Sequence, residues 1–200
     1  CPDSFKEILR QYQEEDFRLD YEYRRFYSAY DQLEETAAFE PLRDLVENIY
    51  TNEYLEMLLP KWNAAIQEPD AFMALPLQRD FYARNLKNAK ERTVVIISDA
   101  MRYEVGKELF RRMQDDPKCT AKLEVQLSVL PSYTRLGMAA LLPHAELTMM
   151  DDFKVLIDGM PCDNLAEREA VLHKYSKNST CVQFDNIKSL KVVELRSIFT

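Results

Sequence analysis

Residues 93–104 have the sequence Thr-Val-Val-Ile-Ile-Ser-Asp-Ala-Met-Arg-Tyr-Glu, and this stretch decides the expected fold. An unbroken apolar run bounded by polar residues is typical of a parallel-sheet strand that is buried on both faces. After the run, apolar residues recur every four positions, at Val105, Leu109 and Met113. We therefore predict a strand at 93–97 that leads through a turn into a helix at 101–113.

Asp99 follows the predicted strand directly. Ligands of open α/β sheets bind at the carboxyl ends of the strands, so this residue is the first candidate for chemistry. One interpretation is that Ser98 or Asp99 caps the following helix by accepting hydrogen bonds from its free N–H groups. The other is that Asp99 is a metal ligand, since a hard carboxylate suits zinc, magnesium or manganese. Position alone leaves both interpretations open.

The composition indicates a folded protein that does not cross a membrane. Of the 200 residues, 46% are hydrophobic and 30% are charged, which is ordinary for a globular protein. No apolar run approaches the roughly 18 to 20 residues that span a bilayer. No signal peptide precedes the first periodic segment, and the chain starts without methionine. We expect a cytoplasmic protein, and the sequence to be a piece of a longer one.

Cysteine and histidine usage argues against a disulfide framework and against a zinc knuckle. The four cysteines form no CxxC pair and are widely spaced (Cys1, Cys119, Cys162 and Cys181). Such spacing favours reduced thiols in the cytoplasm. The histidines are His144 and His173, too few for a Cys/His zinc site.

The net charge of −8 arises mostly from residues 1–90. Proteins held to nucleic acid by phosphate contacts carry a positive balance instead. Direct nucleic-acid binding is therefore not expected from this chain.

The first 88 residues predict a helical unit, since 1–68 contain no glycine and little strand pattern. We expect helices at 4–33, at 41–59 and from Trp62 to Pro69, with a further one at 78–86. Pro41 suits the first turn of the second helix, and Pro60 should end it. The unit should be a helical bundle.

Residues 89–200 predict an α/β domain, because strand and helix patterns alternate. Besides the first strand and helix, we expect strands at 123–130, 146–149, 153–157 and 181–184, helices at 135–142, 165–175 and 190–199, and a turn at Asp158-Gly159. No glycine-rich phosphate-binding loop is present. The predicted fold class is α/β, with helical unit 1–88 followed by sheet domain 89–200.

A second motif repeats the pattern of strand, hydroxyl-bearing bend and helix. Residues 131–138 have the sequence Pro-Ser-Tyr-Thr-Arg-Leu-Gly-Met. A hydroxyl at a helix start can serve as a cap. The same position also favours an anion, because the free N–H groups and the helix dipole stabilise a phosphoryl group. With a divalent metal bound near Thr134 and Asp99, the threonine would become a nucleophile. The two roles are compatible.

The two motifs together resemble the PglZ domain. The likeness is carried by residues 94–104 and, about thirty positions later, 130–143, with Gln78, Phe81 and Tyr82 upstream. It is specific over roughly 78–145 and weaker beyond. The match is similar in particular to the PglZ proteins of bacterial BREX phage-defence systems. That domain belongs to the alkaline phosphatase superfamily, whose members hydrolyse phosphate mono- or diesters at a site with two metal ions, usually zinc.

The resemblance implies roles for particular residues. Asp99 is similar to the metal-binding aspartate of the superfamily, and Thr134 to its nucleophile, which also contacts metal. Ser132 is the weaker alternative to Thr134. Arg102 and Tyr103 match the motif without an assignable role.

This chain lacks the further Asp and His ligands that the superfamily uses. Neither histidine matches a motif, and turn hydrogen bonds explain three further aspartates (Asp151, Asp152 and Asp158). Two ligands cannot hold a zinc ion that takes three or four. We therefore expect this fragment to be inactive alone and to bind no metal, with two zinc ions (Zn2+) in the full-length protein.

Two functions remain open. The first is part of a PglZ-type metal-dependent phosphohydrolase, whose phosphate ester substrate is unknown. The second is a catalytically silent scaffold that binds other proteins of a defence complex through the helical unit.

Overall fold

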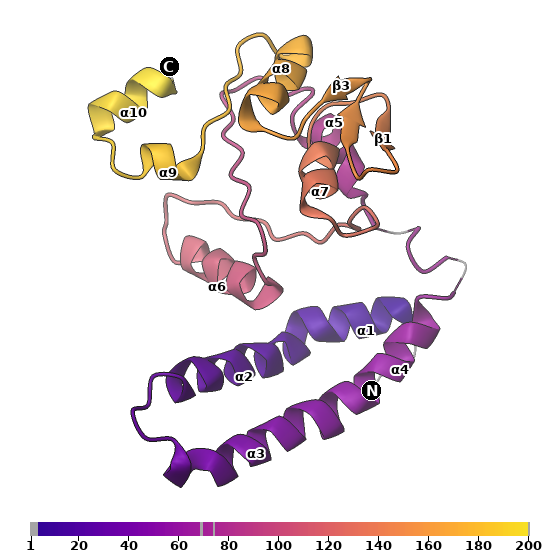
Figure 1. Ribbon diagram of the computed structural model, residues 1–200, viewed down its shortest axis with the longest axis vertical. Helices are drawn as coiled ribbons and strands as arrows, with labels where there is room; N and C mark the ends of the chain where they lie inside the picture. The colour runs from indigo at the N-terminus through magenta and orange to yellow at the C-terminus, as the bar shows by residue number, and fades with distance from the viewer. Residues whose placement is uncertain (1–3, 69, 74, 200) are drawn as a thin grey trace. The chain divides into compact units, whose positions relative to one another are not determined.

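A computed structural model describes residues 4–68, 70–73 and 75–199 (Figure 1). The chain forms two compact units, which are described separately. The first unit comprises Cys1–Leu75 and Ser98–Val125, and the second comprises Pro76–Ile97 and Gln126–Thr200. The division into domains at residue 88 stays a prediction. Cys1, one of the four cysteines, and Pro69, expected to close the third helix, lie outside the described residues.

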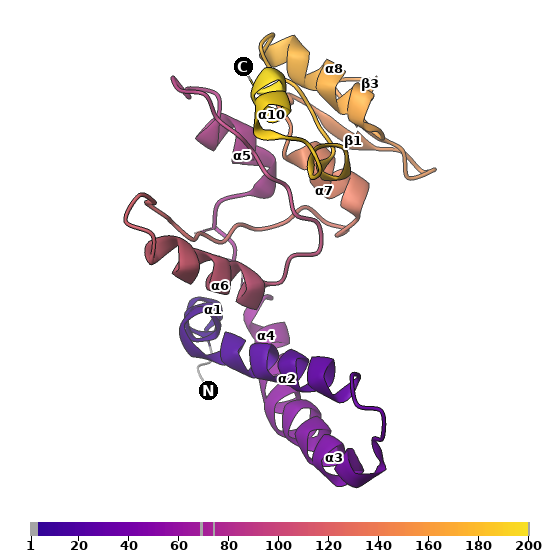
Figure 2. The same cartoon turned by 90° about the vertical axis from the view of Figure 1, so that its left-hand side faces the viewer.

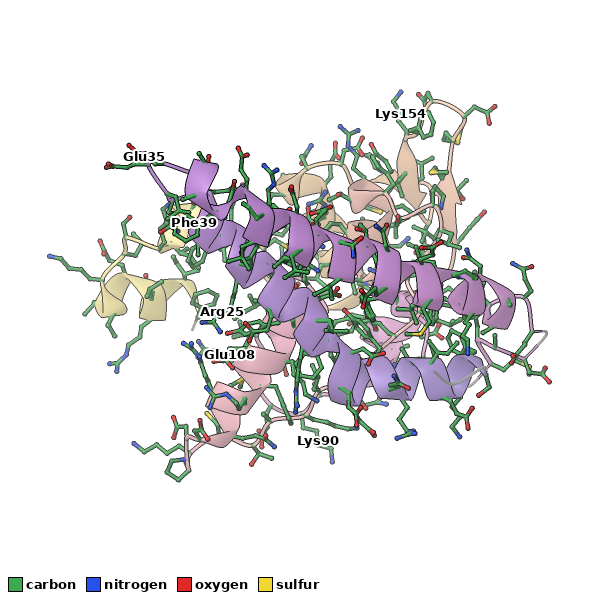
Figure 3. All side chains as sticks on the ribbon, turned by 90° about the horizontal axis from the view of Figure 1, so that it is seen from below. Arg25, Glu35, Phe39, Lys90, Glu108 and Lys154 are labelled. Carbon is green, nitrogen blue, oxygen red and sulfur yellow. The ribbon has the colours of Figure 1, made fainter. Side chains whose placement is uncertain are left out.

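Two long helical rods form most of the first unit. One rod consists of α1 (Phe5–Gln11), a π-helical turn η1 (Tyr12–Asp16) and α2 (Phe17–Tyr30). The other consists of a 3-10 turn η2 (Ala37–Phe39), α3 (Glu40–Asn48), a π-helical segment η3 (Ile49–Leu55) and α4 (Glu56–Ala65). The rods run antiparallel as a hairpin, and Figure 3 labels Glu35 and Phe39 at the connection between them.

The hairpin confirms the helices predicted from periodicity, with one correction. Ser4 caps α1 by accepting from the N–H of Glu7. An apolar cluster near the open end joins α1 to α4 and to the segment after it, with Phe5, Ile8, Ala65 and Ala71 buried at its centre. The prediction that Pro60 ends a helix is wrong, because α4 continues through it to Ala65. Trp62 packs against the same cluster, and the stability gained by this packing offsets the loss of the backbone hydrogen bond that Pro60 removes.

Tyrosines and carboxylates pair between the two rods. Asp20 accepts hydrogen bonds from the hydroxyls of Tyr12 and Tyr50, both at 2.6 Å. Burial raises the pKa of both tyrosines, and their bonds to Asp20 raise it further, so both stay neutral donors. The ring of Tyr50 also stacks on Tyr23 with centroids 3.7 Å apart. The hairpin interior is therefore partly polar, and directional contacts join the two rods.

Helix α6 (Tyr103–Gln114) lies beside α2 in the first unit (Figures 1 and 2). It confirms the predicted helix, although it begins two residues later. The apolar residues that predicted it remain exposed, at 51% for Val105, 49% for Leu109 and 39% for Met113. Its polar face, rather than its apolar face, packs against the hairpin.

The second unit contains a small antiparallel sheet. Strands β1 (Leu147–Met149), β2 (Val155–Ile157) and β3 (Met160–Pro161) are in the order β1-β2-β3, with Leu147 opposite Ile157. The predicted turn at Asp158-Gly159 is confirmed. Both residues have positive φ, 49° and 77°, as a two-residue hairpin turn of this type requires.

Helices cover this sheet and complete its core. The unit contains η4 (Gln78–Asp80), α5 (Phe81–Asn85), α7 (Thr134–Ala140), α8 (Leu165–Tyr175), α9 (Phe184–Ile187) and α10 (Val192–Ile198). The buried cluster takes residues from α7, β2, the segment after β3 and α8, namely Leu136, Ala139, Val155, Ile157, Cys162 and Val171. The helices predicted at 78–86, 135–142, 165–175 and 190–199 are confirmed within a few residues.

Three predicted strands are wrong. Residues 93–97 are irregular and exposed, with 88% of Ile96 accessible. The segment 123–130 makes a single parallel bridge, between Leu77 and Leu127, and 181–184 is irregular up to α9. A strand needs hydrogen-bonding neighbours, and the described residues supply none beside 93–97. The chain is α/β in content, but its sheet is antiparallel and the predicted parallel sheet does not form in the described part.

Candidate functional site

Thr134 is the first residue of α7, where the sequence predicted a helix start. Its side chain is exposed, and the N-cap position belongs to Tyr133, which makes no side-chain cap hydrogen bond. The capping interpretation of Thr134 is therefore wrong. The first intrahelical bond runs from the N–H of Gly137 to the carbonyl of Tyr133 at 2.9 Å, so the preceding N–H groups lack partners inside the helix.

Gln78 fixes the segment on which Thr134 lies. Its side-chain Nε2 donates to the carbonyl of Gly137 at 3.1 Å, and its Oε1 accepts from the N–H of Val129 at 3.1 Å. Its backbone N–H donates to the carbonyl of Leu127 at 2.9 Å. One residue thus holds both the chain entering the motif and the helix leaving it. The sequence resemblance included Gln78 but gave it no role.

Packing on the inner side of α7 orients the helix. Leu136 and Ala139 are buried in the core of the second unit, at 6% and 0% exposure. On the outer side, Nη1 of Arg135 lies 3.6 Å from Oδ1 of Asp163. Because Leu136 and Ala139 face the core, the neighbouring residues Thr134 and Arg135 are exposed at the surface.

Asp99 lies in a tight turn of the first unit. Its carboxylate is exposed, and its Oδ1 accepts from the N–H of Ala100 at 3.0 Å. Ala100 has a φ of 55°, in the left-handed region that alanine rarely occupies. Helix α6 starts at Tyr103 and its N-cap is Arg102, so neither Ser98 nor Asp99 caps it. The capping interpretation is wrong here as well.

The other polar residues considered from the sequence make local structural contacts. The ring Nδ1 of His144 is 2.7 Å from the carbonyl of Leu142, and Nε2 of His173 is 2.5 Å from that of Ser179. Asp152 accepts from the N–H of Lys154 at 3.1 Å, as a turn aspartate does. These contacts agree with a structural role.

The cysteines of the described region are free. Cys162 is buried, Cys119 is exposed and Cys181 is partly buried. Burial raises the pKa of the Cys162 thiol, which makes it a poor nucleophile.

The described residues do not form a complete metal site. No three His, Cys, Asp or Glu side chains among residues 4–68, 70–73 and 75–199 gather closely enough to hold a metal ion. The Asp99 carboxylate suits a zinc ion as one ligand, but zinc takes three or four. Asp99 belongs to the first unit and Thr134 to the second, so their pairing at one site stays a prediction.

Comparison with known protein families shows the family to which this chain belongs. The family model described as the BREX system PglZ alkaline phosphatase-like domain matches residues 80–200. This chain belongs to the PglZ family. The match includes both sequence motifs and confirms the resemblance inferred from them.

Two curated PglZ relatives match nearly the whole chain. The "Alkaline phosphatase-like protein PglZ" of Bacillus cereus (strain H3081.97) is 36% identical over 201 residues, which cover 97% of this chain and 24% of that protein. The "Alkaline phosphatase-like protein BrxZ" of Escherichia coli O9:H4 (strain HS) is 34% identical over 202 residues, which cover 94% of this chain and 22% of that protein. This PglZ chain therefore spans about a quarter of the length of these relatives.

No solved structure matches this PglZ chain. None of the helices in its described part combines the length and apolarity needed to span a bilayer.

Proposed function

We propose that this chain contains the amino-terminal part of the core of a PglZ-type metal-dependent phosphohydrolase, preceded by helices, in which Thr134 is the nucleophile and Asp99 a metal ligand. The observation that carries the proposal is the exposed Thr134 at the start of α7, inside the range matched by the alkaline phosphatase-like family. Thr134 is not used as a cap, and its helix is held by Gln78. The relatives are about four times longer, so the further ligands would come from residues outside this chain.

In this proposal Thr134 and the first turn of α7 would take part in ester hydrolysis. Oγ1 of Thr134 would attack the phosphorus of an ester and displace the alcohol, and water would then hydrolyse the phosphothreonine. The N–H groups of the first turn of α7 would donate to phosphoryl oxygens. Divalent metal ions, two zinc ions in this proposal, would favour the deprotonated threonine and offset the negative charge on the phosphoryl group.

Exposed apolar surface supports an alkaline-phosphatase-like sheet in the larger protein. Ile96 and Val94 are 88% and 59% exposed, and the face of α6 that carries Val105 is also exposed. Large apolar surfaces of this kind usually mark contact sites. We propose that strands from the remainder of the protein pair with 93–97 and cover it. In that arrangement 1–88 would be a helical unit and 89–200 the first portion of the sheet domain.

The test is metal-dependent hydrolysis by a full-length PglZ protein that contains this sequence. With zinc added, we expect hydrolysis of bis-p-nitrophenyl phosphate or p-nitrophenyl phosphate, with kcat reduced at least about 100-fold in Thr134→Ala. Asp99→Asn should lower zinc affinity, measured separately by competition with a chromophoric chelator. Full activity of Thr134→Ala would refute the assignment.

Matched surface variants serve as controls for this test. Thr120→Ala and Asp151→Asn change the same residue types at exposed positions outside the two motifs, and both should retain wild-type kcat and zinc affinity. Ser132→Ala tests the weaker candidate nucleophile, and we expect it to stay active.

A second function, a scaffold for other proteins of a cytoplasmic defence system, is favoured by the outer face of α3. Leu42 and Leu45 on α3 and Ile49 at the start of η3 lie at helical spacing and are 47%, 54% and 43% exposed. In this case the helical unit would capture a partner protein from the same system, and Leu42→Glu/Leu45→Glu would abolish the capture. The hydrolase and scaffold functions are compatible, and absence of zinc from the full-length protein would favour the scaffold alone.

A further inference from the structure

Glu104 is a buried carboxylate five positions after Asp99. Among the described residues it is the one charged side chain that is buried, with 3% of its surface exposed. It lies in the first turn of α6, where the helix dipole favours a negative charge. Its Oε2 atom is buried without a hydrogen-bond partner, so compensation of its charge depends on the contacts of Oε1.

Arg24, on α2, supplies that contact. Its Nε donates a hydrogen bond to Oε1 of Glu104, and its Nη2 lies 3.7 Å from Oδ2 of Asp20. Asp20 is held in turn by the hydroxyls of Tyr12 and Tyr50. Arg24 therefore ties α6 to a hydrogen-bonded network that involves both rods of the hairpin.

A second group of contacts joins α6 to the same rod. The hydroxyl of Tyr103 and Nζ of Lys107 both donate to the carbonyl oxygen of Gln13, at 3.2 and 3.3 Å. Gln13 lies in the π turn η1, an irregularity that is frequent at functional sites. The ring of Tyr103 also packs on Phe17, with centroids 5.8 Å apart. These contacts explain why α6 packs through its polar face.

The contacts that hold α6 also affect Asp99, which lies in the turn before this helix and belongs to no helix or strand. Its turn contains Ala100 in the left-handed region, a backbone conformation that persists only where the surrounding structure holds it. We propose that Arg24 and Glu104 are positioning residues, whose ion pair fixes α6 and, through α6, the turn that presents Asp99. The inference rests on the proposed role of Asp99 as a metal ligand.

Hydrogen exchange in the full chain tests the ion pair without any metal. Arg24→Gln leaves a buried carboxylate unpaired, so exchange of the hydrogen-bonded amides of Ala100, Val105 and Gly106 should become at least about 10-fold faster. Arg25→Gln is the matched control, because Arg25 is 64% exposed and pairs with Glu22 on its own helix. Equal exchange rates at these three amides in the two variants would overturn the proposal.

A double variant separates the ion pair from general unfolding. Arg24→Gln/Glu104→Gln removes both charges, so its exchange rates should lie closer to wild type than those of Arg24→Gln alone. A double variant that exchanges faster than Arg24→Gln would show independent packing roles and would also overturn the proposal.

Zinc affinity and kinetics of the full-length protein test the link to Asp99. We expect Arg24→Gln to weaken zinc binding about 10- to 100-fold and to lower kcat for bis-p-nitrophenyl phosphate, with partial rescue in Arg24→Lys. Unchanged zinc affinity and kcat in Arg24→Gln, with hydrolysis lost in Thr134→Ala, would refute the positioning role while the proposed function stands. If the wild-type protein neither binds zinc nor hydrolyses the ester, the proposed function fails, and the exchange rates then decide whether the ion pair holds the turn.

Discussion

The carboxamide of Gln78 holds the helix that begins at Thr134 through the carbonyl oxygen of Gly137, at 3.1 Å. The same carboxamide accepts from the N–H of Val129, on the other side of the intervening bend. A side chain 51 positions from Val129 and 59 from Gly137 thus holds the chain on both sides of the bend. Glutamine suits this position because it donates and accepts at once.

Replacing Gln78 by alanine should therefore destabilise the second unit. Two backbone groups lose their partners, and we expect the free energy of unfolding to fall by about 1 to 3 kcal/mol. Urea unfolding of the full chain, followed by circular dichroism, measures the change. In the full-length protein the same variant should lower kcat, since the start of α7 would be less well held.

Gln126→Ala is the matched control for Gln78→Ala. Gln126 is exposed and lies close to the same segment, so its replacement should leave the unfolding free energy within about 0.5 kcal/mol of wild type. Equal effects of the two substitutions would mean that the Gln78 contacts contribute nothing.

Gly137 should tolerate alanine, although it lies in the motif. A Cβ atom at this position would meet Nε2 of Gln78 at 3.5 Å, an ordinary van der Waals distance. Alanine stabilises a helix interior relative to glycine, so Gly137→Ala should raise the unfolding free energy by about 0.5 to 1 kcal/mol. Gly159→Ala provides the contrast, because φ is 77° there and a side chain costs about 1 to 2 kcal/mol. A loss of stability in Gly137→Ala would contradict the packing described.

Local signals account for the parts of the fold that the sequence predicted. Helix α8 begins at Leu165, as expected, because Asn164 and Glu167 form a reciprocal capping box. The Asp158-Gly159 turn follows equally from residue type. The apolar run 93–97 has just as strong a pattern, but a strand exists only with partners that are distant in sequence. Such partners are absent from the described part of the chain.

In the candidate site too, the sequence predicted the features that depend on neighbouring residues but not the contacts between residues far apart in the chain. The helix start at Thr134 and the turn at Asp99 were found from short motifs. The contacts of Gln78 and Arg24 that hold them span 59 and 80 positions, and no periodic pattern in the sequence predicts them.

Asp158 should make the stability of the second unit depend on pH. The hydroxyl of Tyr175 donates to its Oδ2 at 2.5 Å, and the N–H groups of Glu146 and Ala145 donate to Oδ1 at 2.8 and 2.9 Å. These bonds lower the pKa of Asp158 below its ordinary value of 3.8. A lowered carboxyl pKa contributes stability above the unfolded value, and this stability is lost as pH falls through the folded value.

Urea midpoints of wild type and Asp158→Asn between pH 7 and pH 2.5 measure this contribution. We expect the wild type to be the more stable at neutral pH and the difference to shrink steadily below about pH 4. Asp151→Asn, at an exposed turn position, should show no such convergence. A constant difference between wild type and Asp158→Asn over the whole range would show that ionisation of Asp158 is not the cause.

Ala100 should discriminate sharply between small and branched side chains. At a φ of 55° glycine is free of strain, whereas a β-branched residue is a severe outlier. Ala100→Gly should keep the Asp99 turn, and Ala100→Val should force it into another conformation. Hydrogen exchange at Val105 and Gly106, whose N–H groups donate to the carbonyl of Arg102, reports the difference, with faster exchange expected in the valine variant alone. Because Ala100 is next to Asp99, Ala100→Val should also weaken zinc binding in the full-length protein. If the valine variant had wild-type exchange rates and wild-type zinc affinity, the turn would not be held as described.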